Sequence, residues 1–391
     1  MIPLMKNTFI NEFETKQQLA DFILHSNKLS MDVHCLEFEK KFTDVQETSH
    51  AILVNSGASA NLLLLQAMLN LGRLRKGQKI GFSAVTWSTN VMPIIQLGLE
   101  PVPVDCDVNT LNSMSRQLQQ AHEKHGLSAF FITNVLGHCG DLEAIRQYCD
   151  ANSIILLEDN CEALGSRLNG KLTGNFGVGA TFSFFVAHHM STIEGGMVVT
   201  EDEELAEMLI ISRANGWDRN LSAKGRKRLR EKYNITSEFD AKYTFYELAF
   251  NVRPTEITGF LGKVQLGFLK DNIEKRESNY RQIEKMIAAN PDFIPTSTTH
   301  MSFVSSFSFP FVCRTPALRD HYIKEFAGAG IEIRPMIAGN MQKQPFFDKY
   351  CSNRDELPGA DHLHTCAFYC GNYPELTISD IDTIASCLMK E

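Results

Sequence analysis

Short apolar runs alternate along this chain with segments of helical periodicity, and this alternation constrains the fold more than any other feature. The runs lack a polar residue at every second position, so we expect both faces of each strand to be buried. Strands that alternate with helices build a sheet covered by helices, and we therefore predict an α/β fold. The predicted strands are residues 51–54, 79–82, 102–104, 129–133 and 154–158, and the predicted helices are residues 61–71, 141–149 and 203–213.

The chain of 391 residues is too long for a single small core, and its last third has a different pattern. A long helical pattern runs over residues 255–286 after Pro254, followed by a strand at 302–312 and a helix at 317–326. Thr377 and Asp380 form a capping-box start to a last helix. We predict an N-terminal segment and large cofactor-binding domain over residues 1–254. Residues 255–391 would form the linking helix and a small C-terminal domain.

Residues 222–240 crowd lysines and arginines into a stretch that is almost without apolar side chains, which predicts an exposed loop. A second interpretation is a cover over the diphosphate of a nucleotide, because clustered lysine and arginine suit phosphate. Both interpretations place the basic side chains at the surface.

Charge and cysteine spacing exclude several classes of protein. A net charge of −8 gives no general affinity for nucleic acid. The ten cysteines show no C-x-C or C-x-x-C spacing, so we expect neither a metal site nor an iron–sulfur cluster. No segment offers the roughly 20 apolar residues that span a bilayer, and the N-terminus has no export signal. We expect a cytoplasmic protein with reduced thiols and no membrane partner.

Small residues mark the junction between the first predicted strand and its helix. Ser56, Gly57 and Ala58 would let backbone N–H groups and a helix N-terminus approach an anion closely. A plain turn is the alternative interpretation of this stretch.

Acidic residues follow the strand at 154–158. Asp159 and Glu162 lie where α/β proteins place ligands, at the carboxyl end of a buried strand. An aspartate there could keep a pyridine nitrogen protonated. The alternative is a carboxylate that only starts a helix.

The stretch Thr181-Phe-Ser-Phe-Phe-Val-Ala-His-His, followed by Glu194-Gly-Gly, resembles the sugar-nucleotide aminotransferase (DegT/DnrJ/EryC1/StrS) family of type I pyridoxal-phosphate enzymes. In that family a serine-containing strand end is followed by the cofactor lysine and then by a glycine turn. Aligned on Ser183 and Glu194, the lysine position is His188. The resemblance implies the type I aminotransferase fold, with a large mixed-sheet domain and a smaller C-terminal α+β domain.

Other residues fall in the family's chain order, and the resemblance implies their roles. Trp87 would stack on the pyridine ring of the cofactor, and Asp159 would pair with its nitrogen. Glu162 would reach the ring hydroxyl, and Ser183 would bind the phosphate. Asn251 would reach the cofactor phosphate of the neighbouring subunit, which implies a homodimer with a shared active site.

A histidine at position 188 cannot tether the cofactor through a Schiff base, but it can move protons near neutral pH. The same replacement characterises the sugar 3-dehydratases of the family. The segment after Trp217 lacks the cysteines of the iron–sulfur branch, which favours the branch that takes its electrons from L-glutamate and cycles between pyridoxal and pyridoxamine phosphate. The implied substrate is a nucleotide-linked 4-keto-6-deoxy sugar, GDP-4-keto-6-deoxy-D-mannose, and the implied pathway is colitose synthesis for the lipopolysaccharide O-antigen. For His189 we expect an ordinary structural role.

One departure and two alternatives remain. The dehydratases of colitose synthesis have His-Gly-Trp where this chain has Asn215-Gly-Trp, so the sugar or the nucleotide could differ. A sugar-nucleotide 4-aminotransferase and a non-catalytic descendant of the family are the alternatives. The candidate substrate-binding residues, chosen by neighbourhood, are Trp217, Arg219, Tyr246, Arg253 and Glu332.

Overall fold

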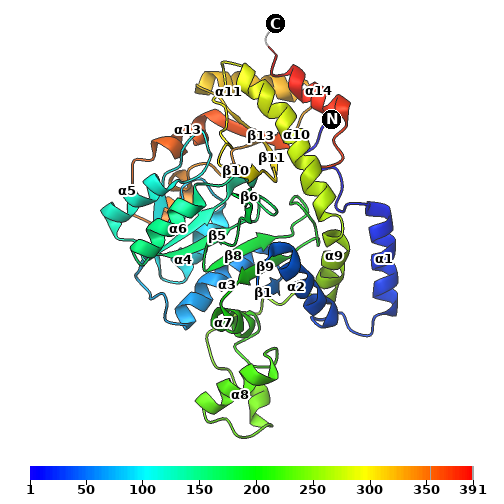
Figure 1. The fold of residues 1–391 in the computed structure, drawn as a ribbon, viewed down its shortest axis with the longest axis vertical. Helices are drawn as coiled ribbons and strands as arrows, with labels where there is room; N and C mark the ends of the chain where they lie inside the picture. The colour runs from blue at the N-terminus through cyan, green and yellow to red at the C-terminus, as the bar shows by residue number, and fades with distance from the viewer. Residues whose placement is uncertain (353, 390–391) are drawn as a thin grey trace.

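A mixed seven-stranded sheet forms the centre of the computed structural model, which describes residues 1–352 and 354–389 (Figure 1). The strand order is β1-β9-β8-β5-β4-β2-β3. Strand β9 is antiparallel to both of its neighbours, whereas β8, β5, β4, β2 and β3 run parallel. The strands are β1 (His50–Val54), β2 (Lys79–Ser83), β3 (Glu100–Val104), β4 (Ala129–Thr133), β5 (Ile155–Asp159), β8 (Gly179–Ser183) and β9 (Gly196–Thr200). The predicted α/β architecture is confirmed, and all five predicted strands are present.

Both faces of this sheet are buried, as the continuous apolar runs predicted. Phe130 and Leu156 belong to one core cluster with residues of the helices on that face, whereas Phe131 and Leu157 belong to a second cluster on the opposite face. Neighbouring residues of a strand point to opposite faces, so an unbroken apolar run needs cover on both sides. The covering helices are α2 (Val33–Gln46), α3 (Gly57–Asn70), α4 (Met92–Gln96), α5 (Ser115–His125), α6 (Leu142–Ala151) and α7 (Glu203–Arg213).

A second sheet gathers the C-terminal part of the chain. Its strand order is β11-β13-β12, and β13 is antiparallel to both of its neighbours. The N-terminus joins this part, because Ile2 forms a bridge with Ile331. A capping box at Thr377 and Asp380 begins α14, as the sequence predicted. The elements are β11 (Ser308–Val312), α11 (Pro316–Gly328), β12 (Ile333–Pro335), α12 (Pro345–Tyr350), α13 (Pro358–Cys366), β13 (Ala367–Gly371) and α14 (Ile378–Ser386).

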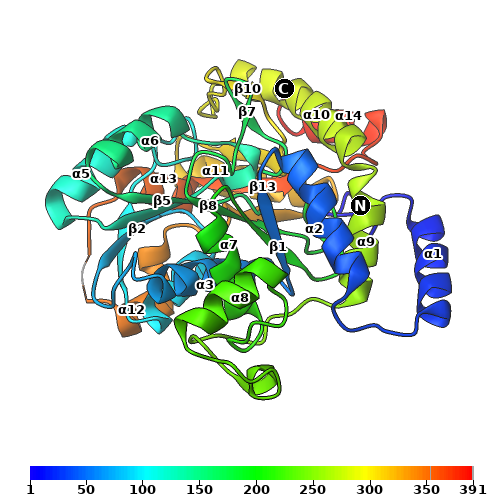
Figure 2. The same ribbon diagram turned by 60° about the horizontal axis from the view of Figure 1, so that its bottom comes forward.

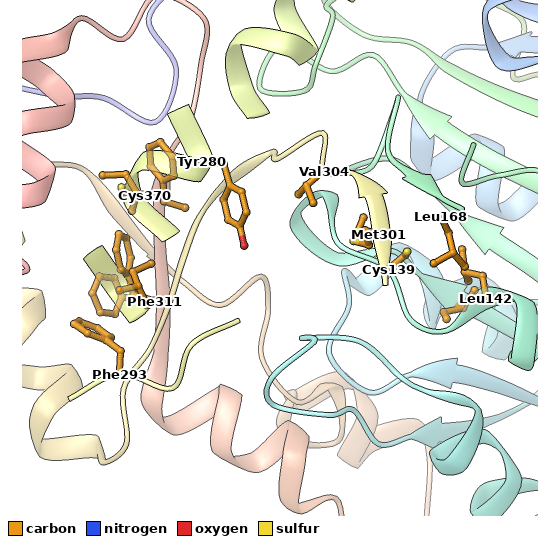
Figure 3. Packing of buried hydrophobic residues seen from close by; sticks show 14 of the residues in the cluster. Cys139, Leu142, Leu168, Tyr280, Phe293, Met301, Val304, Phe311 and Cys370 are labelled. Atoms are coloured by element: carbon orange, nitrogen blue, oxygen red, sulfur yellow. The ribbon is translucent and has the colours of Figure 1, made fainter. Parts of the chain in front are cut away.

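One apolar cluster connects the two sheets. Figure 3 shows one group of its side chains around Phe293 and Phe311, a second around Met301 and Cys139, and Tyr280 between the groups. Tyr280 is 1% exposed, and its hydroxyl bonds the Nε2 atom of His138 at 3.0 Å. The large sheet and the C-terminal sheet therefore share packing, which holds the residues between them in fixed positions.

Two long elements predicted from periodicity are each interrupted. The helix predicted over residues 255–286 is two helices, α9 (Glu256–Leu266) and α10 (Leu269–Ala289), because a short turn at Gly267 separates them. The strand predicted over residues 302–312 is also two: β10 (Met301–Phe303) pairs with β6 (Arg167–Leu168), and β11 pairs with β13. The segment between β10 and β11 crosses from one sheet to the other and brings Phe307 to the site described below.

The loop predicted over residues 222–240 was wrong, because this segment contains helix α8 (Ala223–Lys232). Ser222 caps the helix by accepting a hydrogen bond from the Gly225 N–H at 3.0 Å. Two arginines then tie α8 to its surroundings: Arg230 pairs with Asp218 at 2.6 Å, and Arg228 pairs with Glu207. The helix extends from the body beyond α7, as Figures 1 and 2 show.

The first helix, α1 (Glu12–His25), lies at the edge of the molecule beside α9 (Figure 1). In the described part of the chain, no helix is both long and apolar enough to cross a membrane. Across the same residues, no group of three or more histidine, cysteine or acidic side chains could hold a metal ion.

Candidate active site

A cavity of about 400 Å³ opens where the parallel strands of the large sheet end. Strands β2, β4 and β5 finish at Ser83, Thr133 and Asp159, and the loops that follow them form much of the wall. The carboxyl ends of parallel strands are where α/β sheets bind ligands. The wall consists of Ser56, Gly57, Ala58, Trp87, Thr89, Asn90, Thr133, Asp159, Cys161, Glu162, Ser183, Phe185, Ala187, His188, Glu194, Phe307, Ile337 and Tyr369.

Asp159 is held at the bottom of this cavity by three donors. The amides of Asn61 and Asn90 donate to its Oδ2 atom at 3.0 and 2.7 Å, and the backbone N–H of Cys161 donates to Oδ1 at 2.9 Å. The side chain of Asn61 is itself fixed, because the Thr181 hydroxyl donates to it at 2.6 Å. The arrangement therefore offers a carboxylate in a fixed position to a protonated ring nitrogen.

The start of α3 forms a cradle for an anion. Ser56 caps the helix, its hydroxyl accepting from the Ser59 N–H at 3.1 Å. A Cβ atom on Gly57 would lie 2.6 Å from the Cβ of Ser183 and 3.2 Å from the Sγ of Cys161, so only glycine fits here. Because Gly57 and Ser183 lie so close together, the N-terminus of α3 and the Ser183 hydroxyl are both at one end of the cavity. This is the chemistry that binds a phosphate group.

Trp87 presents a large aromatic face to the cavity. Its side chain is 57% exposed although it lies in the wall of a binding site, and Phe185 beside it is 42% exposed. Exposed aromatic rings in a concave site are suited to stacking on a flat ligand. These groups together fit pyridoxal phosphate. Asp159 fits its ring nitrogen, the start of α3 fits its phosphate, and Trp87 fits the face of its ring.

His188 lies in the loop after β8, between two aromatic rings. Its imidazole centre is 6.1 Å from the ring centre of Phe185 and 5.4 Å from that of Phe307. Its Nδ1 atom is buried without a hydrogen-bond partner in the described part of the chain, which leaves Nε2 as the accessible nitrogen. Burial, with the charge of Arg276, lowers the pKa of His188 to about 4. The ring is therefore neutral at pH 7 and able to accept a proton.

His189, the next residue, has a different environment. It is 1% exposed, its Nε2 atom bonds the carbonyl oxygen of Ser305 at 2.9 Å, and it does not line the cavity. Its partner is a backbone carbonyl, as expected of a structural histidine.

Glu162 carries a second carboxyl in the cavity wall, in surroundings unlike those of Asp159. Among the described residues one donor reaches it, the Leu136 N–H, at 2.9 Å from Oε2. Burial raises the pKa of Glu162 to about 8, with a smaller contribution from the charge of Asp159. Glu162 can therefore donate a proton in a hydrogen bond, whereas Asp159 accepts from three donors.

We expect Glu162→Gln to remove a pH dependence of stability from the cofactor-free protein. The folded chain keeps the Glu162 proton up to about pH 8, whereas the unfolded chain releases it near the ordinary pKa of 4.5. The wild type should therefore lose stability relative to the variant as the pH rises from 4.5 to 8, by at most about 1.4 kcal/mol per pH unit. Urea unfolding at several pH values measures this difference. A difference that stays constant across this range would contradict the neutral carboxyl.

Several residues predicted from the sequence lie outside the cavity. Asn251 is exposed and accepts a hydrogen bond from Arg253 at 3.0 Å. Trp217 stacks on Phe245 at 6.2 Å, and the Arg219 guanidinium lies 4.0 Å from the Trp217 ring centre. These residues form a cluster on the surface, outside the cavity wall.

Tyr246 and Glu332 also lie apart from the cavity. The Tyr246 hydroxyl donates to Asp218 at 3.4 Å, and Glu332 accepts from the Leu4 N–H at 3.0 Å and pairs with Arg334. Asn215, where the sequence departs from its relatives, has a φ of 59°, a left-handed conformation that asparagine adopts more readily than most residues. Its backbone N–H bonds the Phe250 carbonyl at 2.8 Å.

Sequence reasoning missed two groups of wall residues. Asn90, which holds Asp159, lies three residues after Trp87 and could have been found as a polar residue of the same loop. Phe307, Ile337 and Tyr369 come from the C-terminal third of the chain and carry no local signal. Only the packing of that part against the large sheet brings them to the cavity.

The mixed sheet and the cavity at its edge place the chain among pyridoxal-phosphate enzymes of the aminotransferase fold. The crystal structure of GDP-4-keto-6-deoxymannose-3-dehydratase with a trapped PLP-glutamate geminal diamine superposes with a TM-score of 0.91, at 31% identity over 100% of both chains. An H188N mutant of this dehydratase (ColD) with bound GDP-perosamine gives a TM-score of 0.89, also at 31% identity and 100% of both chains.

The chain belongs to the DegT/DnrJ/EryC1/StrS aminotransferase family, which it matches over residues 11–389. Among its curated relatives is the GDP-4-keto-6-deoxy-D-mannose 3-dehydratase of Yersinia pseudotuberculosis, 34% identical over 381 residues that cover 94% of each chain. The family resemblance and the fold predicted from the sequence are both confirmed.

Proposed function

We propose that this protein is a pyridoxal-phosphate-dependent 3-dehydratase that removes the C3 hydroxyl of a nucleotide-linked 4-keto-6-deoxy sugar, GDP-4-keto-6-deoxy-D-mannose. L-Glutamate serves as the co-substrate that converts pyridoxal phosphate to pyridoxamine phosphate. The relatives named above share this activity by name, and they match 94% and 100% of the chain.

The proposal rests on the residues that line the cavity. It holds His188 beside the groups that fit the cofactor, and none of its described wall residues is a lysine. A transaminase needs a lysine amine to bind its cofactor and to release its amino product. A histidine in the same cavity can only move protons, which suits a dehydratase that does not keep the amine on the sugar.

The cofactor supplies the electron sink that lets the C3 hydroxyl depart, and the protein supplies binding and orientation. Asp159 would hold the ring nitrogen, and Trp87 the ring face. The N-terminus of α3 and Ser183 would hold the phosphate, and Glu162 would donate to the ring hydroxyl.

His188 would move the protons of both halves of the reaction through its accessible Nε2 atom. In the first half it would transfer the proton of the glutamate Cα, and in the second it would remove a proton so that the C3 hydroxyl can leave. The products are a 3-deoxy-4-keto sugar, 2-oxoglutarate and ammonia. Glutamate gives up two electrons, and the sugar takes them as it loses one oxygen.

The surface cluster of Trp217, Arg219 and Arg253 supports a homodimer whose active site is shared. Large apolar side chains nearby are exposed, among them Phe245 (58%) and Leu248 (72%), and a second subunit would cover them. In a shared site Asn251 would reach the phosphate of the partner's cofactor, and the arginines would meet the diphosphate of the sugar nucleotide. Light scattering after size-exclusion chromatography, which gives the mass in solution, tests the dimer.

The activity is tested by incubating the protein with pyridoxal phosphate, L-glutamate and GDP-4-keto-6-deoxymannose, and weighing the sugar nucleotide by mass spectrometry. We expect a product that lacks one oxygen, with 2-oxoglutarate and ammonia released in equal amounts. An amino sugar would show a 4-aminotransferase instead. Unchanged sugar, with glutamate still converting the cofactor, would contradict this substrate while leaving the cofactor chemistry in place.

A further inference from the structure

A buried arginine lies behind the loop that carries His188. Arg276, on α10, is 1% exposed, and its guanidinium forms no ion pair within the described residues. It donates instead to the Asn272 side chain at 2.8 Å and to the backbone carbonyls of Phe307, at 3.0 Å, and Asn372. An unpaired charge in a protein interior is costly, so its retention calls for an explanation.

The contacts of Arg276 reach His188 from two sides. Phe307, whose carbonyl Arg276 holds, places its ring 5.4 Å from the His188 ring. Asn272, which accepts from Arg276, donates in turn to the backbone carbonyl of His189. His188, His189, Asn272 and Arg276 also line one small cavity of about 20 Å³, together with other polar residues that include Glu375. Arg276 therefore connects helix α10 both to the segment that carries Phe307 and to the loop that carries His188.

The charge of Arg276 acts on the same histidine. It opposes a second positive charge on His188, and burial acts in the same direction, so the pKa of His188 falls to about 4. The other titratable groups around the imidazole are His189, whose pKa is also lowered, and Glu162, Glu194 and Tyr369 of the main cavity. Glu375 lines the small cavity, where its charge favours the positive form of Arg276. No carboxylate is within hydrogen-bonding distance of the described His188 side chain to counter the arginine.

We propose that Arg276 is a positioning residue that keeps His188 neutral and fixes its ring against Phe307, so that the imidazole is ready to accept a proton. The role rests on the proposed function of His188 as the proton carrier. The hydrogen bonds of Arg276 to the Phe307 carbonyl and to Asn272 hold the segments on either side of the imidazole, and its charge opposes a second positive charge on the ring.

The test follows the His188 imidazole directly, without turnover. The full-length protein is labelled with ¹³C at histidine Cε1, and the His188 signal is assigned by its loss in His188→Asn. In the wild type this signal should show no protonation down to pH 5.5. In Arg276→Met the midpoint of its titration should rise by at least about one pH unit, whereas Arg276→Lys, which keeps the charge, should leave His188 unprotonated at pH 6.

Arg281→Met is the matched control, because Arg281 lies on the same helix, is partly exposed and pairs with Glu277 and Glu284. It should leave the His188 signal unchanged. A wild-type midpoint of 6.5 or above would overturn the proposal, as would a midpoint that is the same in Arg276→Met and the wild type. If Arg276→Met does not fold, protonation of His188 at pH 6 in the lysine variant would overturn it. These signals do not depend on the sugar, so failure of the dehydratase assay is a separate result.

Discussion

Replacing His188 with lysine should abolish dehydration while letting the chain hold its cofactor covalently. The imidazole is the one accessible proton acceptor between Phe185 and Phe307, and loss of a general base costs about 100- to 10,000-fold in rate. A lysine amine at the same point can bond to the cofactor aldehyde, which an imidazole cannot do. The loss is measured by mass spectrometry of the sugar product, and the covalent bond by borohydride reduction followed by the mass of the intact protein.

His321→Lys is the matched control, because His321 is an exposed histidine on α11 that does not line the cavity. It should keep full dehydratase activity and show no added cofactor mass after reduction. Undiminished dehydration in His188→Lys would show that another group carries the proton. A second variant, His188→Asn, should lose dehydration without gaining the covalent bond, which separates the two consequences of the substitution.

The parts of the site that sequence reasoning found all belong to short segments where a strand ends. Asp159 ends β5, Ser183 ends β8, and Ser56 and Gly57 follow β1. In a parallel sheet, residues at the carboxyl ends of different strands meet at one edge, so knowing the strands is almost enough to assemble the site. Apolar runs buried on both faces are the clearest strand signal, and for that reason these residues could be predicted.

Long-range packing explains what could not be predicted. Phe307 reaches the cavity because residues 301–312 divide between two sheets, and nothing in their local pattern marks the division. Helix α8 was missed for another reason. Its lysines and arginines are good helix formers, but it has no apolar face, so its sequence lacks the repeat of apolar residues by which a helix is recognised. The role of Arg276 was also beyond local patterns, because a charged residue within a helix normally signals an exposed face.

Replacing Asp159 with asparagine should slow the glutamate-driven conversion of the cofactor by at least about 100-fold, the usual cost of removing a fixed electrostatic group from an active site. The variant loses the negative charge that would keep the ring nitrogen protonated. Its amide also places an NH2 group where one carboxylate oxygen was. Either Asn61 and Asn90, which both donate to Oδ2 in the wild type, or the Cys161 N–H, which donates to Oδ1, therefore loses its acceptor. Stopped-flow absorbance with pyridoxal phosphate and L-glutamate measures the rate.

Asp202→Asn serves as the control for this change. Asp202 caps α7 by accepting from the Leu205 N–H at 3.0 Å and pairs with Arg73 at 2.6 Å, away from the cavity. Asparagine caps helices about as well as aspartate, so this variant should fold and convert the cofactor at the wild-type rate. If Asp159→Asn stayed within tenfold of the wild type, the charge beneath the cavity would have no part in the chemistry. In that case Asp159 would serve only to hold Asn61 and Asn90 in place.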